Sequence, residues 1–160
     1  MDKELRQGYA TRVAQANNTE LVVIVYEAAL TSIQEGKEAL DQGDLETARR
    51  EITRAEDFLE ELMRSLDMKY EISHYLRQLY IYARRELCQG MALRDSSLFD
   101  HSTGVLEGLL PSFKELAKQD TSRPIMENTE QIYAGLTYGR GSLNETTAMG
   151  DNINNRGSLA

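Results

Sequence analysis

Several long stretches of the chain repeat apolar residues at helical spacing, and the first of them is the most apolar. Its run of residues 21–26 (LVVIVY) has no polar interruption and is rich in β-branched side chains. Taken alone, the run fits a buried strand as well as a helix. The flanks favour a helix, because Asn17 and Glu20 match a capping box and apolar residues continue at three-, four- and seven-residue spacing. The pattern therefore predicts a central helix over residues 18–42 that other helices cover on most sides.

Three further helices are predicted after the central one. Residues 45–66 form a heptad seam, in which apolar residues alternate at three and four positions with Glu and Arg between them. Such a seam is typical of antiparallel helices that cross at about 20°. A third helix is expected over residues 70–91 and a fourth over residues 98–117, where Pro111 should kink or break the helix. We predict an all-α protein, an antiparallel four-helix bundle.

The N-terminal segment carries a much thinner apolar stripe. Leu5, Tyr9 and Val13 recur at fourfold spacing in an otherwise polar stretch, residues 3–14. Because short isolated helices are marginal in water, this short extra helix is expected to dock on the bundle. Each of its apolar side chains contributes about 1.5–3 kcal/mol at full burial, and three of them are too few to anchor a helix firmly. We therefore predict a mobile N-terminal segment, residues 1–16.

The composition changes after Lys118, where the bundle domain, residues 1–118, is expected to end. Residues 119–160 are polar and rich in Gly and Asn, which predicts an irregular, partly disordered C-terminal tail. One short apolar cluster within it, residues 132–138 (IYAGLTY), could dock on the bundle.

Composition and charge narrow the range of functions. A chain of 160 residues with 41% hydrophobic content is one domain with room for a real core. A net charge of −8 argues against nucleic acid as a partner, because phosphate binding needs a cationic face. Without a membrane span of about 18–20 apolar residues or an apolar signal core, a cytoplasmic protein with no membrane insertion is expected. Cys88, the only cysteine, cannot form an intrachain disulfide and is expected to be a buried, inert thiol.

Two histidine-based sites can be tested against the sequence. Glu71 and His74 form a Glu-x-x-His motif, which is half of a di-iron site in a four-helix bundle. The second half is missing, because Leu98 and not a glutamate precedes His101 by three residues. His74 could instead serve histidine phosphotransfer, but two bulky residues follow it where a response regulator would have to dock. We predict no catalytic residue, no metal and no cofactor.

Apolar surface remains after the bundle seams are assigned. The central helix has more apolar width than three partner helices require, and the third helix carries tyrosines beyond its core stripe. Periodicity alone leaves two interpretations open: tyrosines at the rim of the core with wet hydroxyls, or a groove that receives an amphipathic partner segment. The groove candidates are Val22, Val25 and Tyr26 on the central helix, with Ile72, Leu79, Tyr80 and Tyr82 on the third.

The start of the central helix also resembles a known family, the flagellin-specific export chaperones of the FliS type. The family's hallmark is Ser/Thr-Pro-x-Glu-Leu-Val-x-Met-Leu-Tyr-Asp-Gly-Ala-Leu, and residues 20–22 (ELV), Tyr26, Ala29 and Leu30 match it. Two asparagines, residues 17–18, replace its capping residue and its proline. Asparagine also caps a helix, and proline at the first helical position is not essential. The other departures, IV for Met-Leu and EA for Asp-Gly, are physically mild.

Other positions agree with the family in order and spacing. A tryptophan that is usual in the family's last helix is Phe113 here, which makes that apolar site smaller. The resemblance spans roughly residues 5–118 and says little about the tail. The supporting matches are an upstream tyrosine and valine, and a Tyr-x-Tyr followed by an arginine and a leucine: Tyr9, Val13, Tyr80, Tyr82, Arg85 and Leu87.

The resemblance implies a non-enzymatic cytoplasmic chaperone that binds the disordered C-terminal segment of flagellin. It would prevent premature polymerisation and support flagellum assembly by the flagellar type III export system, with export-gate components as further partners. On this view, residues 3–14 are a movable flap over part of the groove, and residues 132–138 are a rival for the same role. A histidine phosphotransfer protein that uses His74 and a purely structural helical oligomer are the alternatives.

Overall fold

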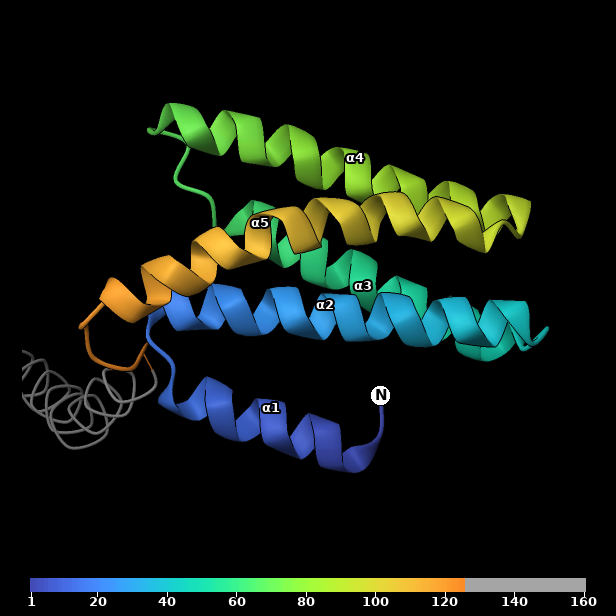
Figure 1. Cartoon of the computed structure of the whole chain (residues 1–160), viewed down its shortest axis with the longest axis horizontal. Helices are drawn as coiled ribbons and strands as arrows, with labels where there is room; N and C mark the ends of the chain where they lie inside the picture. Colours follow the sequence, from blue (N-terminus) through green and yellow to red (C-terminus); the bar gives the residue numbers. More distant parts are fainter. Residues whose placement is uncertain (126–160) are drawn as a thin grey trace, which may run out of the picture.

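The computed structural model describes residues 1–125, which form a bundle of α-helices and contain no strand. The prediction of an all-α fold is confirmed, and the long helices begin and end within about two residues of the predicted positions. The helices, shown in Figure 1, are α1 (Lys3–Gln15), α2 (Asn18–Asp41), α3 (Leu45–Arg64), α4 (Glu71–Leu93), the 3₁₀ turn η1 (Ser96–Leu98) and α5 (Phe99–Gln119).

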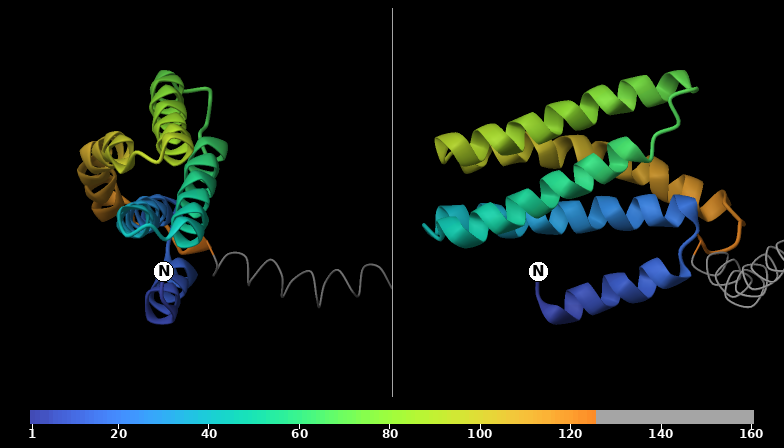
Figure 2. Two further views of the ribbon diagram at one scale, coloured as in Figure 1. Left: turned by 90° about the vertical axis from the view of Figure 1, so that its right-hand side faces the viewer. Right: turned by 180° about the vertical axis from the view of Figure 1, so that it is seen from behind.

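Helices α2, α3, α4 and α5 pack in a ring, each against its two neighbours. The end-on view in Figure 2 shows these four helices around one core, with α1 outside the ring and next to α2. Short turns join most of these helices, so that consecutive helices run antiparallel. Helix α1 buries none of its residues, as its thin apolar stripe predicts.

Capping side chains fix where the helices start. The Oδ1 atom of Asn17 accepts a hydrogen bond from the backbone N–H of Glu20 at 2.9 Å, which confirms the predicted N-cap. Oδ1 of Asp44 accepts from the N–H of Thr47 at 3.1 Å in the same way. In the α2–α3 connection, Gly43 adopts φ 80°, a left-handed conformation that a residue with a side chain would take only with strain. Gly43 and the capping residue Asp44 together make this turn short.

Two glycines allow the helices to pack closely at one end of the bundle, where the α2–α3 and α4–α5 connections lie. A Cβ atom at Gly36 would come within 2.6 Å of the side chain of Ile52, and one at Gly90 within 2.5 Å of the ring of Phe99. Only glycine permits such an approach, because packed interiors leave no spare volume. We call this the closed end of the bundle.

Helix α5 continues through Pro111, so of the two expected outcomes, a kink or a break, the break does not occur. Pro111 is exposed, and the backbone hydrogen bond that proline cannot make is therefore lost on the side of the helix that faces water. Figure 1 shows the second half of α5 turning away from α4 and toward the start of α2. This divergence opens the second end of the bundle.

Candidate partner-binding surface

The open end of the bundle lies where α2 and α4 begin and α3 and α5 end. Apolar side chains remain exposed there: Ile72 is 61% exposed, Tyr75 59% and Leu116 52%. Ile72 lies on the same stripe of α4 as Leu76 and Leu79, four and seven residues on. Leu76 is only 8% exposed. Ser73, the next residue to Ile72, is 5% exposed, so Ile72 lies at the edge of the buried stripe with its own side chain exposed.

Two adjoining hollows lie beside α2 at the same end, and both include Asn18 and Val22. A hollow of about 430 Å³ between α2 and α5 is also lined by Phe113 and Leu116. A second hollow, of about 390 Å³ between α2 and α3, reaches Val25. The apolar residues of these hollows and the exposed apolar residues at the start of α4 lie at the same end of the bundle, and we call them together the open-end groove: Val22, Val25, Ile72, Tyr75, Phe113 and Leu116.

Three of the seven predicted groove residues belong to this surface. Val22 and Val25 are partly exposed on α2, and Ile72 is the most exposed residue of the predicted set. Leu79 and Tyr82 are partly exposed farther along α4. The guanidinium carbon of Arg85 lies 5.4 Å from the centre of the Tyr82 ring, within the range of a cation–π contact.

Two of the predicted groove residues belong to the core instead. Tyr26 and Tyr80 are 0% and 1% exposed, and their hydroxyl oxygens lie 2.5 Å apart. The ring of Phe113 packs 5.1 Å from that of Tyr26. Burial is the main cause that raises the pKa of both hydroxyls, so both stay neutral. Because each hydroxyl pairs with the other, this layer of rings leaves neither polar group unsatisfied.

Helix α1 takes a different position from the one that the flap prediction gave it. It lies on the side of α2 away from α4, as Figures 1 and 2 show, and so it does not cover Ile72. The hydroxyl of Tyr9 is 3.0 Å from Oγ1 of Thr31, while Val13 is partly exposed. Leu5 is 42% exposed. The three apolar residues of the predicted flap thus make a weak contact with the outer face of α2.

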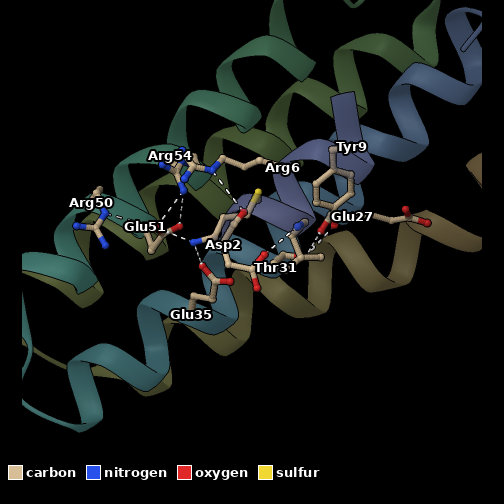
Figure 3. A network of polar contacts seen from close by, with 11 residues as sticks. Asp2, Arg6, Tyr9, Glu27, Thr31, Glu35, Arg50, Glu51 and Arg54 are labelled. Atoms are coloured by element: carbon tan, nitrogen blue, oxygen red, sulfur yellow. Dashed lines mark hydrogen bonds and ion pairs between the residues drawn. The ribbon is translucent and has the colours of Figure 1, made fainter. Parts of the chain in front are cut away.

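The strongest anchor of the N-terminal segment is electrostatic. Figure 3 shows Glu51, which is 1% exposed, between cationic groups. Nη1 of Arg54 donates to both oxygens of Glu51 at 3.0 Å, and Nε of Arg50 lies 3.6 Å away. The amino group of Met1 contacts Glu35 and lies 3.1 Å from Oε1 of Glu51. Burial alone would raise the pKa of Glu51, but the bond from Met1 and the charge of Arg54 together lower it.

This lowered pKa gives a testable dependence of stability on pH. A carboxyl whose pKa is depressed in the folded state adds stability above its unfolded pKa of about 4.3, and loses it as pH falls through the folded value. We expect Glu51→Gln to lower the free energy of unfolding by about 1–3 kcal/mol at pH 7. The difference from the unchanged protein should shrink toward pH 3 in urea titrations. A difference that is the same at both pH values would contradict the assignment.

The described residues offer little for catalysis. Among residues 1–125, no cluster of His, Cys, Asp and Glu side chains could hold a metal ion. His74 is exposed on α4. Cys88 is also exposed, so the expectation of a buried thiol was wrong: it lies on the outer face of α4, where no helix covers it. Over the same part of the chain, no helix has the length and apolar character needed to cross a membrane.

An open apolar surface on a rigid helical bundle defines a class of binding protein, and comparison with known proteins identifies the family. The family model described as "Flagellar protein FliS" matches residues 1–120. A curated relative, the flagellar secretion chaperone FliS of Bacillus subtilis (strain 168), is 25% identical over 107 residues, which cover 67% of this chain and 77% of the relative. The chain belongs to the FliS family of flagellar proteins. Family and relative together support the class of flagellar export chaperones.

Sequence reasoning missed three residues of the groove, namely Tyr75, Phe113 and Leu116. Their apolar character is visible in the sequence, and Phe113 stood out as the counterpart of the family's tryptophan. Their exposure depends on where α5 leaves α4, which is a property of the assembled bundle. The only local signal was the weakened helical pattern around Pro111.

Proposed function

We propose that this chain binds the C-terminal segment of flagellin in the open-end groove and keeps it from polymerising before export through the flagellar type III system. The observation that carries the proposal is the exposure of Ile72, an apolar residue that is 61% exposed at the open end of the bundle. A guest helix with an apolar face could continue the packing of the bundle at this position. The proposed role takes place in the cytoplasm and needs no catalytic step.

The energetics suit a guest that orders as it binds. An unstructured segment pays conformational entropy when it folds onto a surface, so it must bury a large apolar area in return. The open end offers exposed or partly exposed apolar side chains from α2, α4 and α5, including Val22, Ile72 and Leu116. Because the bundle is rigid before binding, little of the binding energy is spent on ordering the chaperone itself.

The proposal can be tested by following the polymerisation of purified flagellin by light scattering. One equivalent of this protein should suppress filament growth, whereas it should leave flagellin truncated at its C-terminal segment unbound. Undiminished polymerisation at a several-fold excess would contradict the proposal. Export-gate components are further partners that we propose for the loaded chaperone, which co-purification with the guest bound would test.

We also propose that residues 3–14 are a movable flap on the outer face of α2. Its support is the weak packing of α1, in which Leu5 is 42% exposed and no residue is buried. Release of the segment would uncover more of α2 for the guest. Deleting it should then raise the affinity for the flagellin segment, or its association rate, about 2–10-fold in stopped-flow measurements. If neither the affinity nor the association rate increased, the flap proposal would be contradicted.

A further inference from the structure

A short strap that follows α5, residues 120–125, fixes the path of the chain beside the start of α2. Oγ1 of Thr19 donates a hydrogen bond to Oδ2 of Asp120 at 2.6 Å. At the other end of the strap, the backbone N–H of Ile125 donates to the carbonyl of Ala16 at 2.9 Å. Both ends of the strap are therefore tied to the α1–α2 junction, more than 100 residues away in sequence.

Further hydrogen bonds hold the strap against the bundle. Nδ2 of Asn17, a residue only 3% exposed, donates to the carbonyl oxygens of Asp120 and Ser122 at 3.3 and 3.4 Å. Hydrogen bonds from Ser122 and Thr19 lower the pKa of Asp120 to about 2, so this side chain is charged at neutral pH. A negative charge beside the N-terminus of α2 is favourable, because the helix dipole is positive there.

This strap begins at the edge of the open-end groove and ends beside Ala16, two residues before Asn18, which lines the same groove. Asp120 itself lines the hollow between α2 and α5, together with Val22 and Leu116. The next part of the chain, residues 126–160, lies outside the described residues, and so does its one apolar cluster, residues 132–138. The cluster begins seven residues after Ile125, and an extended chain covers about 23–25 Å in that length. The hollow is within that reach.

We infer that residues 132–138 occupy the open-end groove of their own chain, so that a guest must displace them. The cluster has no charged residue, and its tether starts at Ile125, which is bound to Ala16 beside the groove residue Asn18. A short tether gives an effective concentration of about 1 mM, so even a weak contact competes with a dilute guest. Docking of the cluster involves this chain alone, whereas its competition with a guest rests on the proposed function.

A disulfide trapping experiment on the full chain tests the docking without any guest. In a Cys88→Ser background, Thr137→Cys is paired with Gln119→Cys, which lies on the rim of the α2–α5 hollow. The matched control pairs Thr137→Cys with Gln15→Cys, next to the anchor of Ile125 at Ala16 but outside the groove. Docking predicts that the Gln119 pair closes at least about ten times faster under mild oxidation. Equal rates, or faster closure at Gln15, would overturn the inference.

The effect on the guest is measured separately. Ile132→Asp with Leu136→Asp should raise the affinity of the full chain for the flagellin segment about 10-fold, whereas Ser142→Asp with Ala148→Asp, outside the cluster, should not. Selective trapping with unchanged guest affinity would contradict the competition between tail and guest. If no variant bound flagellin, the proposed function would fall, and the trapping result would still decide whether the tail docks.

Discussion

The substitution Ile72→Asp is expected to weaken binding of the flagellin segment about 10–100-fold and to leave the thermal unfolding temperature almost unchanged. Ile72 is 61% exposed in the free protein, so the bundle does not depend on it. In the complex its side chain would be covered, and burying it contributes about 1.5–3 kcal/mol. A carboxylate at the same place would have to lose its water without a partner, which adds to the penalty. Titration calorimetry and a thermal melt measure the two effects.

Leu93 provides the matched control on the same helix. It is 70% exposed, and it lies at the closed end of the bundle instead of the open end. Leu93→Asp should therefore change neither the affinity for flagellin nor the stability. Equal losses of affinity in the two variants would place the guest elsewhere on α4, and no loss in the Ile72 variant would remove Ile72 from the binding surface.

Tyr80→Ala is expected to lower the free energy of unfolding by about 3–5 kcal/mol, the usual cost of truncating a large buried ring. Tyr80 is 1% exposed, and its hydroxyl is the partner of the buried hydroxyl of Tyr26. The substitution removes the packing of the ring and leaves Tyr26 without that hydrogen bond, which itself costs about 1–3 kcal/mol. Urea unfolding followed by circular dichroism measures the change.

Tyr75 is the control for this second substitution. It is also a tyrosine of α4, but it is 59% exposed at the groove. Tyr75→Ala should cost less than about 1 kcal/mol of stability and should weaken guest binding instead. If Tyr80→Ala kept its stability and lost only flagellin binding, the original assignment of Tyr80 to the groove would be right and the core assignment wrong.

The helices themselves could be predicted from the sequence because helical order is local. Apolar spacing and capping residues such as Asn17 and Asp44 act within a turn or two, and the structure keeps the predicted starts. Ile72 was predicted from the sequence as a groove candidate, and its side chain is exposed.

The burial of individual side chains within the bundle could not be predicted in the same way. Periodicity shows which face of a helix is apolar, but not whether that face meets another helix or water. In the sequence, Tyr26 and Tyr80 looked like aromatic residues outside the core. The hydrogen bond between them joins helices that are far apart in the sequence, so the pattern along one helix does not reveal it. The exposure of Leu116 depends on the path of the last helix, and the position of α1 depends on contacts such as that of the Met1 amino group with Glu51. Such contacts exist only after the chain has assembled.

The measurement that tests the account most directly is titration calorimetry of the full chain, at several temperatures, with the C-terminal segment of flagellin from the same genome. The account predicts one-to-one binding with a strongly negative heat-capacity change, the signature of apolar burial. It also predicts that the same titration with the Ile72→Asp variant is weakened. No binding, either by the full chain or by the Ile132→Asp, Leu136→Asp variant with its tail disabled, would contradict the proposed function.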